Sequence, residues 1–460
     1  MLDDTIAAIS TPVGEGGIGI VRISGNRSKE IAQKLFVPKK KRKKGSIVER
    51  TLFLGDIVDP DTGEIVDEVL LAYFKSPRSY TREDMVEINC HGGMIVQQKV
   101  LELVLKSGAR AAEPGEFTKR AFINGRIDLS QAEAVIDIIR AKTNRALKMA
   151  TKQLSGGFSE KVKNIRVALL GLITQIEANI DYPEEDIPEA DIGTLKVEVK
   201  KAELALSDLL KGVRSGKLFR EGLSALIAGN TNVGKSSLLN ALLDEDRAIV
   251  TDIPGTTRDV IEEYIDIKGL PVKIIDAAGI RETTNKVEKI GIDKAMKHLE
   301  EAEIVLVIID ASRELSQDDK KIMELSKDKP VLVVLNKIDL PEKTTEEMVK
   351  RILPDKTIIK ISALHKHGID KVKEAIFHIV NTKIGSLDEG VVIAGERQKI
   401  ILESALDCLK RAWNSIDQLY PIEIIEIDIR EAWERLGEII GDSVTDEIID
   451  SIFQNFCIGK

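Results

Sequence analysis

The sequence is poor in cysteine and has no long apolar run. Its three cysteines, Cys90, Cys408 and Cys457, are widely separated and odd in number, which argues against a disulfide framework and favours a reducing compartment. They also form no pair with the spacing of a zinc site. No apolar stretch reaches the roughly 18 residues of a membrane-spanning helix, and the N-terminus lacks the basic region and apolar core of a secretion signal. We therefore expect a soluble, cytoplasmic protein with no membrane partner.

An excess of positive charge is also absent. The formal net charge is -9, so a basic coat for nucleic acid is excluded and any RNA contact must come from a local patch. One basic run, Lys39 to Lys44, lies between Pro38 and Gly45. By composition such a run is more often a solvated loop than an RNA contact, and both interpretations stay open.

The first part of the sequence mixes short β-branched runs with helical spacing. The 460 residues exceed the roughly 250–300 at which a single core stops growing, so several domains are expected. We predict an α+β domain over residues 1–118, from candidate strands at Ile18–Ile23, Val66–Ala72 and Met85–Ile88 and a candidate helix at Ile95–Lys106.

Two later stretches, residues 119–215 and 384–460, have helical periodicity throughout. Ser130 and Glu133 have the spacing of a capping box at the start of one of these helices. The second stretch is too short to hold a comfortable core alone, so we expect the two to pack into one discontinuous α-helical domain. Residues 216–383 are then an insertion, which is tolerated where chain ends lie close.

Four motifs within the insertion occur in the order of a GTPase. They are G-x-x-x-x-G-K-[ST] at Gly229–Ser236, D-x-x-G at Asp276–Gly279, N-K-x-D at Asn336–Asp339, and Ser362-Ala363-Leu364. An apolar run precedes each of them, so the site is expected at the strand ends of an α/β sheet. The predicted strands are Leu223–Ala228, Val272–Ile275, Val331–Leu335 and Thr357–Ile361, with a helix at Ser236–Leu243 after the first loop.

The residue types in these motifs suit GTP and Mg²⁺. Lys235 supplies a positive charge for the outer phosphates, and the Ser236 hydroxyl is an oxygen ligand for Mg²⁺. We expect Thr257 to supply the second protein oxygen. The Asp339 carboxylate can accept two hydrogen bonds from guanine, whereas adenine offers no matching pair of donors.

The four motifs alone do not identify the hydrolytic machinery. Ile280 stands where Ras-like GTPases carry the glutamine that orients water, and an aliphatic side chain cannot do this. Arg281, Glu282 and Glu288 follow, and they fit either a water-orienting group or a solvated helix face. Asn232 in the phosphate loop fits either a ligand to a monovalent cation or an ordinary Asx-type hydrogen bond.

Several segments outside the four motifs carry a family resemblance. They are Thr11–Gly25, His91-Gly-Gly93, Pro114–Phe122, Asp252-Ile-Pro-Gly-Thr-Thr-Arg-Asp259 and the terminal Cys457-Ile-Gly-Lys460. Together with the GTPase motifs they closely resemble the MnmE (TrmE) family of tRNA-modification GTPases over essentially the whole chain. The resemblance implies an N-terminal folate-binding-like domain that forms a homodimer, a discontinuous helical domain, and an inserted Ras-like G domain with a phosphate loop.

The resemblance also implies a reaction and its partners. Family members act with an MnmG-like protein that contains FAD, in a heterotetramer or larger assembly. They add an aminomethyl or carboxymethylaminomethyl group at C5 of the wobble uridine of certain tRNAs. The implied cofactors are GTP, Mg²⁺, K⁺ and a 5-formyl- or 5,10-methylene-tetrahydrofolate, with FAD only in the partner. Hydrolysis is expected to require K⁺ and the meeting of two G domains.

Site residues follow from matched positions. For K⁺ they are Asn232, Thr251, Ile253 and Thr256; for catalysis Lys235, Glu288, which orients water, and Arg281, which supports it; for folate Arg22, Glu87, Arg126 and Lys460. The expected GTP-binding residues are Asn232, Val233, Gly234, Lys235, Ser236, Ser237, Thr251, Asp252, Ile253, Pro254, Gly255, Thr256, Thr257, Asp276, Ala277, Ala278, Gly279, Asn336, Lys337, Ile338, Asp339, Ser362, Ala363 and Leu364.

Two questions stay open. Cys457 is a candidate nucleophile, because a thiolate near Lys460 would be activated, but its position alone does not establish that the sulfur reacts. Two other functions also fit the motifs. One is a ribosome-assembly or regulatory GTPase without folate chemistry, and the other is a folate-dependent transferase in which the G domain only regulates.

Overall fold

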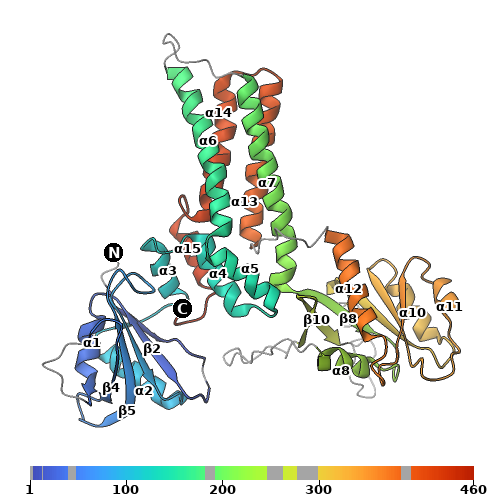
Figure 1. Cartoon of the computed structure of the whole chain (residues 1–460), viewed down its shortest axis with the longest axis horizontal. Helices are drawn as coiled ribbons and strands as arrows, with labels where there is room; N and C mark the ends of the chain where they lie inside the picture. Colours follow the sequence, from blue (N-terminus) through green and yellow to red (C-terminus); the bar gives the residue numbers. More distant parts are fainter. Residues whose placement is uncertain are drawn as a thin grey trace, which may run out of the picture.

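The computed structural model describes residues 4–12, 14–39, 48–181, 192–245, 263–276, 299–384 and 395–460. Two sheet-containing domains flank an upright bundle of long helices (Figure 1). The C-terminus returns to the N-terminal domain, at the opposite end of the molecule from the second sheet. Within the described ranges, no helix is long and apolar enough to cross a membrane.

The N-terminal domain is built on a seven-stranded sheet of order β3-β4-β5-β6-β2-β1-β7. Its pairs are antiparallel except for β1 with β7, and the predicted strands and helix of this region are confirmed. Its helices α1 and α2 share a core with the sheet. The elements are β1 Ile6–Ile9, β2 Gly19–Ser24, α1 Ser28–Leu35, β3 Phe36–Pro38, β4 Leu52–Val58, β5 Ile65–Phe74, β6 Met85–Cys90, α2 Met94–Lys106 and β7 Arg110–Ala111.

The two helical stretches pack together. One apolar core is shared by α6, α7, α13 and α14, although α7 and α13 are separated in sequence by the second sheet. This packing fills the apolar stripe of each long helix against the others. The helices are α3 Glu116–Ile123, α4 Leu129–Arg140, α5 Asn144–Leu154, α6 Gly157–Asp181, α7 Ile192–Glu221, α13 Glu396–Asp417, α14 Ile422–Ile440 and α15 Asp446–Phe453.

The expected capping box at Ser130 is wrong. Helix α4 begins two residues earlier, with Asp128 as its N-cap, and the Asp128 carboxylate accepts a hydrogen bond from the Gln131 backbone at 3.0 Å. Ser130 is fully buried within the first turn, and Glu133 instead pairs with Arg397 of α13 at 3.0 Å. Asp128 is as good a capping residue as serine, and burial of the first turn selects the earlier start.

The inserted domain is a six-stranded α/β sheet of order β13-β12-β11-β8-β10-β9. All pairs are parallel except β9 with β10, so the carboxyl ends of β8, β10, β12 and β13 meet at one edge. The elements are β8 Leu223–Ala228, α8 Lys235–Glu245, β9 Glu263–Ile267, β10 Leu270–Asp276, β11 Ile304–Asp310, α10 Gln317–Leu325, β12 Val331–Asn336, α11 Glu346–Lys350, β13 Thr357–Lys360 and α12 Ile369–Ile384.

Helix α5 joins the helical domain to the inserted sheet. Ala146 and Ala150 of α5 belong to the same apolar core as β8, β9 and β10. The N-cap residue Thr143 donates a hydrogen bond from Oγ1 to the carbonyl of Gly269, in the turn between β9 and β10, at 2.8 Å. Movement of this hairpin would therefore act directly on α5 and on α4 before it.

Candidate functional site

The first predicted motif folds into a tight loop between β8 and α8. Asn232 and Gly234 have φ values of 61° and 101°, in the left-handed region. A Cβ on Gly229 would lie 2.5 Å from the carbonyl oxygen of Ile308, so the loop is held close to β11. Lys235 Nζ donates to the carbonyls of Gly229 and Asn230, both at 2.8 Å, and so the ammonium lies over the loop. This geometry directs the N-terminus of α8 and one positive charge at the same point.

Asn336, at the end of β12, connects three of the four motifs. Its Nδ2 donates to the carbonyl of Val233 at 2.8 Å, and its Oδ1 accepts from the backbone of Ala363 at 2.9 Å. The side chain is buried, with 2% of the residue exposed. A Cβ on Gly234 would lie 2.2 Å from the same Nδ2, so glycine is required at that position. The asparagine thus fixes the phosphate loop relative to the other two motifs.

Lys337 makes a second connection to the phosphate loop. Its Nζ donates to the carbonyl of Asn232 at 2.8 Å and pairs with Oδ2 of Asp310 at 2.6 Å. Burial raises the pKa of Asp310, but hydrogen bonds from Lys337 and Ser312 outweigh burial and hold the pKa below its usual range. Asp310 was not predicted as a site residue. Its place at the carboxyl end of the apolar strand β11 was the available signal.

Asp339 and Ser362 form the outer edge of this site. The Ser362 hydroxyl donates to Oδ1 of Asp339 at 2.5 Å, and this hydrogen bond lowers the pKa of Asp339. The carboxylate is exposed and stays ionised at neutral pH, so it can accept hydrogen bonds from a base with two donors. Leu364, two residues after Ser362, is 78% exposed.

Part of the predicted nucleotide site lies outside the described residues. This applies to Thr251, Asp252, Ile253, Pro254, Gly255, Thr256, Thr257, Ala277, Ala278, Gly279, Ile280, Arg281, Glu282 and Glu288. Asp276 is described as the last residue of β10. Ser236 and Ser237 are exposed in the first turn of α8. Among the described residues the Asn232 side chain makes no Asx-type hydrogen bond, whereas the neighbouring Asn230 side chain accepts from the Thr231 backbone at 2.7 Å.

A second group of predicted residues meets on the N-terminal sheet. Arg22 on β2 and Glu87 on β6 are direct partners across the two strands. Nε and Nη2 of Arg22 both donate to Oε1 of Glu87, at 3.0 Å and 2.8 Å. Arg126 donates to the carbonyl of Tyr80 at 2.7 Å, and its guanidinium lies 4.7 Å from the Tyr80 ring. The Arg22 guanidinium lies 5.6 Å from the same ring, so both arginines lie close to Tyr80.

The C-terminal tail completes this group. The carbonyl of Gly459 accepts hydrogen bonds from Nη1 of Arg22 at 3.2 Å and from the Ser10 hydroxyl at 3.0 Å. Burial, followed by the nearby charge of Arg22, lowers the pKa of Lys460. Arg22, Glu87, Arg126 and Lys460 are thus brought together from distant parts of the sequence. Three cations, one carboxylate and an aromatic ring suit a planar ligand that carries carboxylates.

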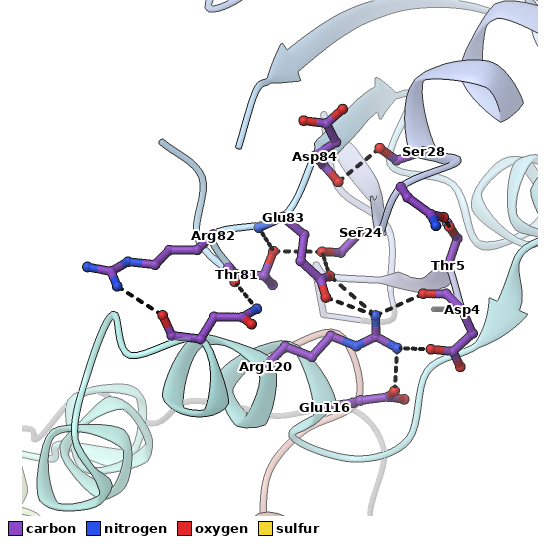
Figure 2. A network of polar contacts seen from close by, with 12 residues as sticks. Asp4, Thr5, Ser24, Ser28, Thr81, Arg82, Glu83, Asp84, Glu116 and Arg120 are labelled. Carbon is purple, nitrogen blue, oxygen red and sulfur yellow. Dashed lines mark hydrogen bonds and ion pairs between the residues drawn. The ribbon is translucent and has the colours of Figure 1, made fainter. Parts of the chain in front are cut away.

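A buried ion network joins the chain segments that carry part of the second group. The Arg120 side chain is fully buried and pairs with Asp4 at 2.7 Å, Glu83 at 3.2 Å and Glu116 at 3.0 Å (Figure 2). Glu83 belongs to the loop that contains Tyr80, and Arg120 to α3. Loss of the arginine would leave three carboxylates near one another without their common partner. The network therefore fixes α3 and the Tyr80 loop against the start of β1.

The cysteines differ in environment. Cys457 is exposed, whereas Cys90 and Cys408 are buried. Cys457 lies near enough to Lys460 for the two groups to interact electrostatically, and among the described residues no hydrogen bond to its sulfur is seen, so its role as a nucleophile stays a hypothesis. In the described ranges, no group of three His, Cys, Asp or Glu side chains could hold a metal ion.

Comparisons with known proteins agree over the whole chain. The chain matches the family models for the "MnmE helical domain" over residues 129–457 and the "GTP-binding protein TrmE N-terminus" over residues 5–126. It is 48% identical over 459 residues to the tRNA modification GTPase MnmE of Alkaliphilus oremlandii, covering 100% of both chains. It is 49% identical over 462 residues to that of Desulforamulus reducens, also covering 100% of both. The solved G domain of the T. maritima FeoB iron transporter matches 34% of this chain and 98% of that chain, at 25% identity and a TM-score of 0.27.

Proposed function

Since the chain belongs to the MnmE family of tRNA modification GTPases, we propose that it hydrolyses GTP as one of two proteins that modify the wobble uridine of certain tRNAs. With an FAD-containing MnmG-like partner, it takes part in adding an aminomethyl or carboxymethylaminomethyl group at C5. A tetrahydrofolate supplies the one-carbon unit. The observation that carries this proposal is the convergence of Arg22, Glu87 and Lys460 in a chain that also has a GTPase loop. A cytoplasmic location is part of the same proposal.

The proposal includes the domain division expected from the sequence. Residues 1–118 bind tetrahydrofolate and dimerise, residues 119–215 and 384–460 form the helical domain, and residues 216–383 bind GTP. Their arrangement supports communication between two sites. Helix α4 begins soon after Arg126 and leads to α5, which contacts the β9–β10 turn through Thr143. These two helices therefore link the candidate folate site to the edge of the inserted sheet where β10 begins, opposite the edge that carries the nucleotide motifs.

In the nucleotide site, the phosphate loop and Lys235 bind the outer phosphates. The exposed Ser236 hydroxyl in the first turn of α8 fits an oxygen ligand for Mg²⁺, and Thr257 supplies the second protein oxygen. Asp339, kept ionised by Ser362, selects guanine. Bound Mg²⁺ neutralises charge that develops on the phosphates. The remaining GTP contacts are those expected from the motifs.

Hydrolysis in this proposal requires K⁺ and the pairing of two G domains. Asn232 and backbone oxygens of Thr251, Ile253 and Thr256 hold the cation, whose charge replaces that of an arginine finger. Support comes from the Asn232 side chain, which has no hydrogen-bond partner within the described part of the chain. Glu288 orients the attacking water and Arg281 supports that switch.

In the folate site, Glu87 recognises the N–H edge of the pterin and the cations bind the carboxylates. The donor set fits this ligand. Both Arg22 donors use Oε1 of Glu87. Among the described residues, Oε2 is therefore left to accept a hydrogen bond from the ligand. Arg126 and Lys460 supply positive charge at the rim. The folate carries the one-carbon unit, whereas these side chains bind and orient it.

An apolar patch on the N-terminal sheet supports the homodimer. Leu52, Leu54 and Leu70 are 61%, 49% and 41% exposed, and Leu54 and Leu70 are direct partners across β4 and β5. Contiguous exposed apolar side chains on a sheet are typical of a protein interface. We assign this patch to the interface between two copies of the chain, which assembles with the MnmG-like partner into a heterotetramer or larger complex.

Two assays on the purified protein test the proposal. GTP hydrolysis is measured in KCl and in NaCl, and binding of 5-formyl-tetrahydrofolate is measured by calorimetry. We expect much faster hydrolysis in KCl, together with saturable folate binding that Arg22→Ala abolishes. The matched control is Arg27→Ala, which removes an exposed arginine of the same domain that pairs with Glu30.

Two results would favour other functions. No folate binding by the unaltered protein would point to a regulatory or ribosome-assembly GTPase. Modification that survives Asp339→Asn without added nucleotide would point to a transferase in which the G domain is only regulatory.

A further inference from the structure

Residues 140–166 carry a local positive charge in an acidic chain. The segment has eight lysines and arginines and one acidic residue, Glu160, which gives it a charge of +7. The whole chain has -9, so the remaining residues together carry -16. Helix α5 within this segment contains no acidic residue.

Three lysines of this segment form a continuous row. Lys148 and Lys152 are exposed and one turn apart on α5. The Lys152 side chain passes the start of α6, because a Cβ on Gly157 would lie 3.5 Å from its Cγ. Lys161 is one turn beyond Gly157 on the same side of α6 and is also exposed. Helix geometry gives a Cβ separation of about 5–6 Å within each one-turn step. We call these three residues the lysine row.

Within the part of the chain that the structure describes, none of the three ammonium groups of the lysine row makes an ion pair or a hydrogen bond. Several lysines on other helices are instead paired along the same helix, for example Lys200 with Glu203 and Lys201 with Glu198. Like charges one turn apart destabilise a helix, so the row is unfavourable in the isolated protein. An anionic ligand would remove this repulsion.

We propose that the lysine row binds the phosphate backbone of tRNA. The assignment to tRNA rests on the proposed function, whereas the preference for a nucleic-acid backbone rests on the row itself. Lysine is depleted in protein–protein interfaces but is a common phosphate ligand. The location also fits, because α5 lies at the foot of the helical bundle between the N-terminal domain and the G domain (Figure 1). The row positions the tRNA without reading its sequence.

The test compares two triple variants of the full-length chain. The first carries Lys148→Gln, Lys152→Gln and Lys161→Gln. The control carries Lys320→Gln, Lys321→Gln and Lys327→Gln, which remove three exposed lysines in and just after α10, on the outer side of the G domain (Figure 1). Both lose the same charge. Dissociation constants are measured by fluorescence anisotropy from 50 to 200 mM KCl, for a tRNA with a wobble uridine and for one with a wobble cytidine.

We expect the row variant to bind both tRNAs at least about 40-fold more weakly at 50 mM salt, and the control to bind as the unaltered protein does. Each lost phosphate contact makes the fall of log affinity with log salt less steep, by about 0.9 in slope. Loss of three contacts therefore makes the ratio of the two dissociation constants, row variant over unaltered protein, roughly 40-fold smaller at 200 mM than at 50 mM KCl.

Three results would overturn the assignment. The row variant and the control could have equal tRNA affinity and equal salt slopes. The row variant could weaken binding of only one of the two tRNAs. It could also weaken binding of the MnmG-like partner while tRNA binding stays unchanged, which would make the row a protein interface. Failure of the proposed function would look different: the unaltered protein with its partner would bind tRNA but leave the wobble uridine unmodified.

Discussion

Replacement of Gly234 by alanine tests how the nucleotide site is held together. The added Cβ would lie 2.2 Å from Nδ2 of Asn336, which donates to Val233 and whose Oδ1 accepts from Ala363. Gly234 also has a φ of 101°, which alanine adopts only under strain. The loop relieves the clash by leaving its present shape. Nucleotide binding then has to restore both the loop and the Asn336 bridge.

The expected loss of nucleotide-binding free energy has two parts. Backbone strain in a sparsely populated region contributes about 1–3 kcal/mol. Breaking the hydrogen bonds of a buried amide contributes about another 1–3 kcal/mol. Together they amount to roughly 2–6 kcal/mol, which weakens binding by between about 30-fold and 10⁴-fold. Titration of the protein into a fluorescent GTP analogue measures this change.

A double-mutant cycle separates the two parts. Asn336→Ala removes the atom that the new methyl group would meet, so adding Gly234→Ala to it should cost only the strain. The loss of nucleotide-binding free energy in the double variant should therefore be smaller than the sum of the losses in the two single variants, by at least about 1 kcal/mol. Gly63→Ala, with a φ of 74° and no neighbouring atom within 4 Å, is the control for strain alone in thermal unfolding. Binding of the analogue by Gly234→Ala within threefold of the unaltered protein would refute the reasoning.

Three other predictions concern separate parts of the chain. Deletion of residues 457–460 should weaken 5-formyl-tetrahydrofolate binding at least tenfold in calorimetry, because Gly459 and Lys460 complete the site of Arg22, and unchanged affinity would contradict this. Iodoacetamide at pH 8 should label Cys457 and leave Cys90, because burial raises the pKa of Cys90 to about 11; mass spectrometry that finds equal labelling would disagree. Burial raises the pKa of Asp137 from 3.8 to about 6 despite its ion pair with Arg220, so this carboxyl contributes roughly 3 kcal/mol less to stability above pH 6 than below pH 4. The melting temperature of Asp137→Asn should therefore fall less than that of the unaltered protein as the pH rises from 4 to 7. Parallel curves of melting temperature against pH for the two proteins would contradict the assignment.

The nucleotide site was largely predictable from the sequence because its parts are local. Each motif follows a strand, and β8, β10 and β12 lie where the apolar runs predicted them. Parallel pairing then brings the strand ends together without further information. Asp310 was missed because it belongs to no motif, although it ends the buried strand β11 and pairs with Lys337. The cap of α4 was misplaced because Asp128 and Ser130 are both good caps, and only burial distinguishes them.

The second site was predictable only through family resemblance. Arg22 and Glu87 are 65 residues apart, and Arg22 and Gly459 are 437 residues apart. Neither spacing has a local signature, so without the family these residues would be assigned to the surface. Arg120 was not predicted at all, because a fully buried arginine depends on three carboxylates supplied by distant segments. Tertiary contacts of this kind are not encoded in periodicity or composition.

The most direct test of the whole account is modification of a wobble uridine in a reconstituted mixture. The mixture contains this protein, its MnmG-like partner, tRNA, a one-carbon tetrahydrofolate, an amine donor, GTP and K⁺, and the nucleoside product is measured by mass spectrometry. We predict modification by the unaltered protein, and none with Arg22→Ala or with Asp339→Asn, although the first still hydrolyses GTP and the second still binds folate. Full modification by either variant would contradict the account.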